Sequence, residues 1–165
     1  MKKYIDFDGV IKDTTPALFD DFPGYSTGTY ISNTEHVIKK DWIYVLANSE
    51  VIGNAVEIVN GLNDAYILTR IHSLENEGVA KISDIRELGF RCDIILVPYQ
   101  VKKTDIVSAK GNILVDDAIF NLDEWQLAGG IPIFFDLYGN NMDGWKVKNT
   151  KYTRTGTLEI LRKYN

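Results

Sequence analysis

Two aspartates separated by one residue are the first candidates for chemistry in this sequence. Asp6 and Asp8 follow the short segment 3–5, and Gly9 permits a sharp exit from it. Two neighbouring carboxylates repel each other and lose hydration, so a cation or a reacting group between them would explain the arrangement. Asp and Gly are also common in simple turns, and the pair alone does not separate the two interpretations.

Other polar residues end other short apolar segments. Thr69 ends one of them, Asp116 and Asp117 end another, and a basic stretch between the two contains Lys103. In a parallel sheet, functional groups gather beyond the carboxyl ends of the strands. We therefore expect these side chains and the first aspartate pair to meet at one edge of a sheet.

The elements that must position these residues alternate along the chain. Short, almost wholly apolar strands between helices are typical of a parallel sheet covered on both faces. The fold class is therefore α/β and Rossmann-like, with a parallel sheet of about five strands and helices on both faces. The predicted strands are 3–5, 65–69, 93–97, 113–115 and 131–135, and the predicted helices are 34–46, 49–62, 75–88, 121–128 and 157–164.

Size and composition limit the possible functions. The chain has 165 residues, of which 45% are apolar, enough for one core. A net charge of −5 argues against broad nucleic-acid binding and against attachment to an anionic membrane. No apolar run approaches the roughly 18 to 20 residues that span a bilayer, so we expect a cytoplasmic protein. The single cysteine, Cys92, is expected to be a small core residue.

The donor set favours a hard metal ion. At about 4 Å and an effective dielectric near 20, each pair of converging carboxylates costs on the order of 4 kcal/mol, which a divalent cation removes. Mg²⁺ suits an all-oxygen site that water and a substrate phosphate complete. With only two histidines and one cysteine in the chain, a zinc site is poorly supported.

Phosphoryl transfer would use every one of these groups. A carboxylate beside Mg²⁺ can attack phosphorus and form an aspartyl-phosphate. A second acid two residues further on can protonate the leaving oxygen and later deprotonate the attacking water. Thr69 can donate a hydrogen bond to the phosphoryl group, and a lysine can neutralise the charge of the transition state.

Taken together, the motifs resemble those of the haloacid dehalogenase (HAD) superfamily, in the same order. They are Asp-Phe-Asp-Gly-Val-Ile at 6–11, Ile-Leu-Thr at 67–69, a downstream lysine, and Ile-Leu-Val-Asp-Asp at 113–117. The second acid of the first motif matches the phosphatase branch. The stretch 103–133 is more narrowly similar to the 5′(3′)-deoxyribonucleotidases and their bacterial relatives.

The resemblance implies a role for each position. Asp6 is expected to be the nucleophile and Asp8 the general acid/base. Lys103 is expected to be the motif lysine, with Lys102 and Lys110 as competing candidates. The phosphate-binding residues are Thr69, Arg70 and Lys103, and the Mg²⁺ ligands are drawn from Asp6, Asp8, Asp116 and Asp117. Which member of the Asp116 and Asp117 pair binds the metal directly is left open.

The resemblance also implies a domain division and a substrate class. Residues 1–15 and 63–165 would form the core domain, and residues 16–62 a small helical cap inserted after the first strand. The expected substrate is a small phosphorylated molecule, with a deoxynucleoside monophosphate as the leading candidate. Alternatives are a sugar phosphate, a nucleic-acid 3′-phosphate, or a catalytically silent HAD-like binding protein.

A phospho-accepting receiver domain is the rival from another class. Receivers also gather acids, a threonine and a lysine at strand ends, but there the threonine follows the phosphorylated aspartate. In this sequence Thr69 precedes both the basic stretch and the second acid pair. This order favours the phosphatase. The sequence does not determine the oligomeric state.

Overall fold

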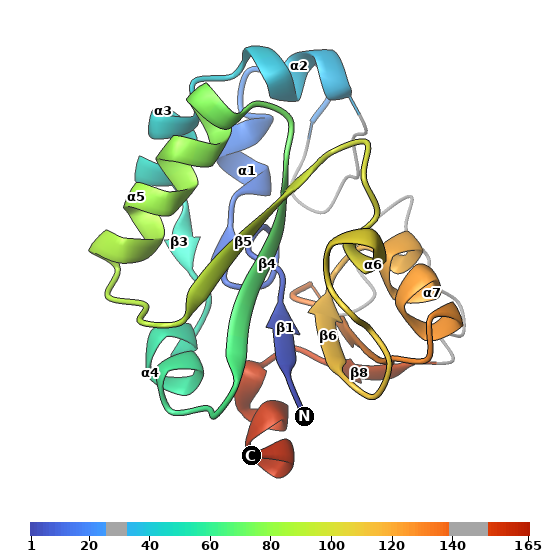
Figure 1. The fold of residues 1–165 in the computed structure, drawn as a ribbon. Coiled ribbons are helices and arrows are strands. Elements are labelled where there is room, and N and C mark those ends of the chain that lie inside the picture. Colours follow the sequence, from blue (N-terminus) through green and yellow to red (C-terminus); the bar gives the residue numbers. More distant parts are fainter. Residues whose placement is uncertain (26–32, 139–151) are drawn as a thin grey trace.

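A six-stranded sheet, parallel throughout, organises the described part of the chain (Figure 1). The computed structural model describes residues 1–25, 33–138 and 152–165. In space the strands follow the order β5 (Asp93–Pro98), β4 (Ala65–Ile71), β1 (Lys3–Ile5), β6 (Ile113–Asp116), β7 (Ile131–Phe135) and β8 (Thr153–Thr155). The predicted α/β, Rossmann-like class is confirmed.

The edge strand β8 is the one strand of this sheet that the sequence did not predict. It consists of Thr153, Arg154 and Thr155, and it pairs with β7 through the Ile133 to Thr153 register. Its residues are exposed or half-buried, because an edge strand has a neighbour on one side only. Without an apolar run there was no hydrophobic pattern to detect.

Helices cover both faces of the sheet (Figure 1). The two short strands β2 (Lys12–Asp13) and β3 (Glu50–Val51) form a separate antiparallel pair. None of the described helices is both long and apolar enough to cross a membrane. The helices are α1 (Thr15–Leu18), α2 (Thr34–Lys39), α3 (Trp42–Ala47), α4 (Ala55–Asn60), the π-type turn η1 (Leu74–Gly78), α5 (Val79–Glu87), α6 (Lys103–Ile106), α7 (Ile119–Leu127) and the 3₁₀ helix η2 (Leu158–Tyr164).

Alternating side chains of the central strand enter two separate cores. Ile5 of β1 packs in a cluster with Val45 of α3 and Ile85 of α5. Tyr4, the preceding residue, packs in the other cluster with Trp125 of α7, whose ring meets the Tyr4 ring edge-on. Because successive residues of a strand point to opposite faces, each face of the sheet is covered by its own helices.

The predicted helix 34–46 is divided into α2 and α3. Asn33 caps α2 by accepting a hydrogen bond from the His36 amide. The chain then becomes extended at Lys40, and Asp41 caps α3 by accepting from the amides of residues 43 and 44. A capping aspartate therefore interrupts what the hydrophobic period presents as one helix.

The other predicted helices exist, with different bounds. The prediction of a helix over 49–62 was wrong at its start, because residues 50–51 pair with β2 and only α4 is helical. The helix predicted at 75–88 is α5 preceded by the π-type turn η1. The basic stretch contains α6, and the terminal helix is the 3₁₀ helix η2.

The predicted cap segment 16–62 shares the core of the sheet. Trp42 and Val45 of α3 and Ile58 of α4 lie in the same buried cluster as the β1 residue Ile5. Residues 26–32 of this segment, and residues 139–151 of the predicted core domain, lie outside the described residues. The division into a core domain and a cap stays a prediction, and the described helices of the segment cover one face of the sheet.

Candidate active site

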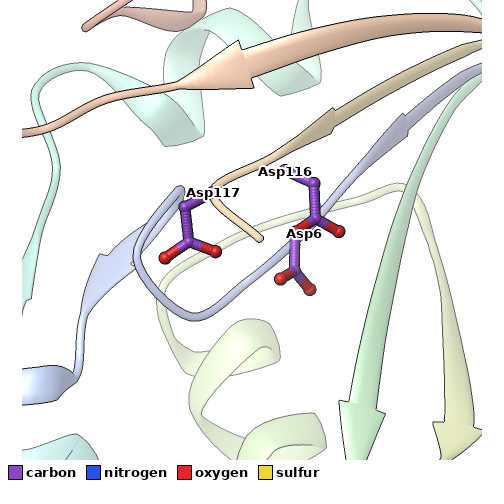
Figure 2. Close-up of side chains that lie close together, drawn as sticks. All are labelled: Asp6, Asp116 and Asp117. Atoms are coloured by element: carbon purple, nitrogen blue, oxygen red, sulfur yellow. The ribbon is translucent and has the colours of Figure 1, made fainter. Parts of the chain in front are cut away.

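Three carboxylates converge where β1 and β6 end. Asp6 directly follows β1, Asp116 is the last residue of β6, and Asp117 follows it. Because β1 and β6 are parallel neighbours with Ile5 level with Val115, Asp6 and Asp116 come side by side. One oxygen of each of the three carboxylates lies within 4.8 Å of the others, and Figure 2 shows their carboxyl groups on the same side of the two strand ends.

Lys103, the first residue of α6, bridges two of these acids. Its Nζ lies 3.0 Å from Asp6 Oδ1 and 2.6 Å from Asp116 Oδ2, and its side chain is buried. Lys102 is 60% exposed and lies 3.8 Å from Glu124. Lys110 is also exposed. Of the three candidate lysines, Lys103 is the one that reaches the acid cluster.

The two adjacent aspartates differ in their hydrogen bonds. Asp116 Oδ1 accepts from the Ala118 amide at 2.8 Å, and Asn121 Nδ2 donates to both Asp116 oxygens. Together with Lys103, these donors occupy Asp116 fully. Asp117 is exposed, and its carboxylate lies so close to Gly9 that a Cβ on the glycine would stand 2.2 Å from Asp117 Oδ2. The predicted sharp turn at Gly9 is present, with a φ of 71°.

The acid cluster shifts the ionisation of its members. Burial, opposed by Lys103 and reinforced by Asp116 and Asp8, raises the pKa of Asp6 to about 7. Desolvation lowers the pKa of Lys103, but the charges of Asp116 and Asp6 outweigh it and the net shift is upward. When all three acids are ionised, their negative charge therefore exceeds the positive charge of Lys103.

The donor set fits a hard divalent cation. All three converging groups are carboxylates, and Lys103 supplies one positive charge against their three negative charges. Asp6 Oδ1 is buried and accepts no hydrogen bond from the part of the chain that the structure describes, although Lys103 lies near it. A divalent cation would satisfy such an oxygen and favour the ionised form of the cluster. The predicted Mg²⁺ therefore has suitable ligands in Asp6 and Asp117, next to Asp116, whose two oxygens already accept hydrogen bonds.

Asp8 lies on the same cavity as Asp6, but other residues hold its side chain. Thr14 donates a hydrogen bond to Asp8 Oδ1 at 2.9 Å, and Lys81 Nζ lies 2.5 Å from Asp8 Oδ2. Thr69 Oγ1 is 3.4 Å from the same Oδ2 atom. The Asp8 carboxylate is 30% exposed, so it remains open toward the cavity while both its oxygens are oriented.

Lys81 and Glu77 are among the residues of the site that the sequence interpretation missed. Lys81 is fully buried in α5, and its Nζ lies 2.7 Å from Glu77 Oε1. Glu77 Oε2 in turn lies 3.1 Å from His72 Nδ1, so this contact connects His72 to the site. A signal was present: Glu77, Lys81 and the buried Ile85 follow one another at four-residue spacing, which places two charges on the apolar face of the helix.

Thr69 and Arg70, two of the predicted phosphate-binding residues, have protein partners. Thr69 is fully buried. The Arg70 guanidinium donates to Asn121 Oδ1 at 3.2 Å and to the Tyr99 carbonyl at 2.7 Å, and it lies 3.8 Å from Glu124. The role of both residues in phosphate binding stays a prediction.

A cavity of about 240 Å³ opens beside the acid cluster. Asp6, Asp8 and Asp117 lie on its wall, so a bound molecule can reach the candidate nucleophile and the candidate acid/base together. Further wall residues are Asp13, Phe120, Phe134, Tyr138 and Arg154.

The fold matches that of known hydrolases. Neither the family models nor the curated proteins with which the chain was compared match it. Solved structures do match, and several are hydrolases of the haloacid dehalogenase superfamily, so the chain has the fold of that class.

Three of these structures illustrate the likeness. A haloacid dehalogenase-like hydrolase from Streptococcus pneumoniae is 13% identical, with a TM-score of 0.61 over 99% of this chain and 98% of that one. A HAD-superfamily hydrolase from Geobacter sulfurreducens is 12% identical, with a TM-score of 0.58 over 100% and 97%. D,D-heptose 1,7-bisphosphate phosphatase from Burkholderia thailandensis is 12% identical, with a TM-score of 0.53 over 95% and 93%.

Proposed function

We propose that this protein is a Mg²⁺-dependent phosphomonoester hydrolase that acts through an aspartyl-phosphate on Asp6. The observation that carries the proposal is Lys103, whose buried ammonium group lies between Asp6 and Asp116 at the ends of neighbouring parallel strands. Phosphoryl transfer needs a nucleophile, positive charge and a proton donor in one place. Asp8 on the same cavity supplies the proton donor.

Asp6 and Asp117 would hold Mg²⁺ directly, and the family resemblance adds the backbone carbonyl of Asp8 as a further ligand. The support is that Asp116 already receives hydrogen bonds on both oxygens, whereas Asp117 faces the cavity. Asp116 then acts by orienting Lys103. When bound, Mg²⁺ would draw negative charge from the phosphoryl oxygens and keep Asp6 ionised.

In the first step, an Asp6 carboxylate oxygen forms a bond to phosphorus and the bond to the ester oxygen breaks. Asp8 gives its proton to the departing oxygen, which leaves as an alcohol. Lys103 offsets the negative charge that develops around phosphorus, because its ammonium group lies 3.0 Å from Asp6 Oδ1.

In the second step, Asp8 takes a proton from a water molecule that attacks the phosphorus of the aspartyl-phosphate. The bond to Asp6 breaks, inorganic phosphate leaves, and Asp8 is again protonated for the next cycle. Thr14 and Lys81 support both proton transfers by holding the Asp8 carboxylate in one orientation.

The proposed substrate class is the deoxynucleoside monophosphates. Its support is the narrower sequence resemblance to 5′(3′)-deoxyribonucleotidases. A substrate panel needs sugar phosphates beside the nucleotides, because one structure with the same fold is a heptose bisphosphate phosphatase.

The decisive experiment compares the wild type with Asp6→Asn on p-nitrophenyl phosphate and the panel, with Mg²⁺ and with EDTA. We expect Mg²⁺-dependent phosphate release by the wild type and background rates for Asp6→Asn. Asp93→Asn is the matched control, because Asp93 is an exposed aspartate at the first residue of β5 and therefore at the opposite edge of the sheet. Full activity in folded Asp6→Asn would contradict the proposal, and a folded wild type without turnover or Mg²⁺-dependent stabilisation would favour a silent binding protein.

A further inference from the structure

Phe120 is a large apolar side chain left exposed on the wall of the active-site cavity. It is 46% exposed, although it belongs to α7, whose residues Leu122 and Trp125 are fully buried in the core. Phe120 thus lies on the face of the helix that is turned away from this core. An exposed phenyl ring at such a position offers a flat apolar surface to whatever occupies the cavity.

The contact between Phe120 and Arg70 locates the Phe120 ring relative to the strands of the sheet. The Arg70 guanidinium carbon is 5.3 Å from the centre of the Phe120 ring. Arg70 belongs to β4, and α7 begins directly after β6, while β1 lies between these two strands. The contact therefore spans the carboxyl end of β1, where Asp6 is located.

The guanidinium group of Arg70 already has hydrogen-bond and ionic partners within the protein. Its guanidinium donates to Asn121 and to the Tyr99 carbonyl, and Glu124 lies 3.8 Å away. These contacts fix the orientation of the guanidinium, which lies against the ring in a cation–π contact. Arg70, which also lies on the cavity wall, therefore holds the Phe120 ring from one face.

The cavity has room for a ring next to a phosphoryl group. Its volume is about 240 Å³, whereas an apolar cavity of roughly 150 Å³ is enough to hold benzene. We propose that a planar aromatic or heteroaromatic ring of the leaving group stacks on Phe120, so that the preferred substrates are phosphomonoesters whose alcohol carries such a ring. This inference rests on the phosphatase function proposed above.

The test uses benzyl phosphate, cyclohexylmethyl phosphate and ethyl phosphate with Mg²⁺. All three are esters of primary alcohols, and the first two differ mainly in the planarity of the ring. In Phe120→Leu, which stays apolar, kcat/KM for benzyl phosphate is expected to fall about 2- to 12-fold, the range that aromatic pairing adds beyond area burial. The ethyl phosphate value stays unchanged, and Phe120→Tyr keeps the benzyl value.

Arg70→Met separates the holding of Phe120 from phosphate binding. We expect it to lower kcat/KM for benzyl phosphate more than for ethyl phosphate. An equal loss with ethyl phosphate would show that Arg70 binds the phosphoryl group, and it would overturn the proposal that Arg70 serves to hold Phe120.

Two outcomes distinguish the inference from the function beneath it. If the wild type turns over all three esters, the phosphatase function stands. If Phe120→Leu then lowers kcat/KM equally for benzyl and cyclohexylmethyl phosphate, or lowers it for neither, the stacking role alone is overturned. Turnover of none of them overturns the phosphatase function and the stacking role together.

Discussion

Replacement of Lys81 by methionine probes the buried charge beneath Asp8. Lys81 Nζ lies 2.5 Å from Asp8 Oδ2 and 2.7 Å from Glu77 Oε1, and it stands 4.7 Å from the centre of the Trp42 ring. Methionine retains an unbranched apolar side chain and removes the charge. The variant therefore leaves the buried Glu77 carboxylate without its cation.

The expected loss of stability is large because both partners are buried. The side chains of Lys81 and Glu77 are 0% and 3% exposed. Removing one member of a buried ion pair costs about 3–5 kcal/mol, which for a chain of this size lowers the melting temperature by about 6 to 20 °C.

The pH dependence of this effect follows from Glu77. Burial opposes its ionisation, but the hydrogen bond with His72 and the charge of Lys81 outweigh burial and lower the pKa of Glu77. A lowered pKa in the folded state contributes stability above the unfolded value of about 4.5, and this contribution is lost as the pH falls through the folded value. The destabilisation by Lys81→Met should therefore be full at pH 7 and shrink below about pH 4.

Thermal and urea unfolding of a double-mutant cycle with Glu77→Gln measure the effect. The double variant has no unpaired glutamate, so we expect its destabilisation to be smaller than the sum of the single ones, by about 0.5–3 kcal/mol. Lys39→Met is the matched control, because Lys39 and Glu35 form a pair with the same four-residue spacing but are 71% and 77% exposed. Its melting temperature should not change measurably.

The same variant tests the support of Asp8. We expect Lys81→Met to lower kcat for p-nitrophenyl phosphate with little change in KM, because Asp8 loses a contact that orients it for proton transfer. The reasoning is refuted if Lys81→Met has the same melting temperature as the Lys39→Met control. It is also refuted if the destabilisation of the double variant equals the sum of those of Lys81→Met and Glu77→Gln.

Four further predictions concern the metal and the lysine of the site. Gly9→Ala, whose Cβ would stand 2.2 Å from Asp117 Oδ2, should lose the Mg²⁺-dependent rise in melting temperature, and a rise equal to that of the wild type would contradict the proposed Asp117 ligand. Because the pKa of Asp6 is raised to about 7, the metal-free protein should lose stability as the pH rises from about 4 through 7. For the same reason Mg²⁺ affinity, measured by calorimetry, should fall up to about tenfold per pH unit below pH 6, where Asp6 holds a proton that the metal must displace. Lys103→Met should abolish phosphate release while Lys102→Met, altered at an exposed neighbour, retains it; equal loss in both would contradict the bridging role of Lys103.

The sequence by itself determined the strands and the acids at their ends. An apolar run followed by an acid is a local pattern, and parallel strands place such ends at one edge of the sheet whatever the loops between them do. This is why the convergence of Asp6, Asp116 and Asp117 could be predicted from the order of residues alone. The apolar pattern did not predict β8, because this strand has no apolar run. It also predicted one helix over 34–46, where the cap at Asp41 starts a second helix despite the continuous hydrophobic period.

Only the tertiary structure decided which charged side chains serve these acids. Lys102 and Lys103 are adjacent, and no local pattern says which one turns toward Asp6, because that depends on how α6 is placed against the sheet. Lys81 reaches Asp8 across 73 positions of sequence. Contacts between residues so far apart in the sequence depend on how the side chains pack and are buried. Packing and burial are defined only once the helices have docked on the sheet.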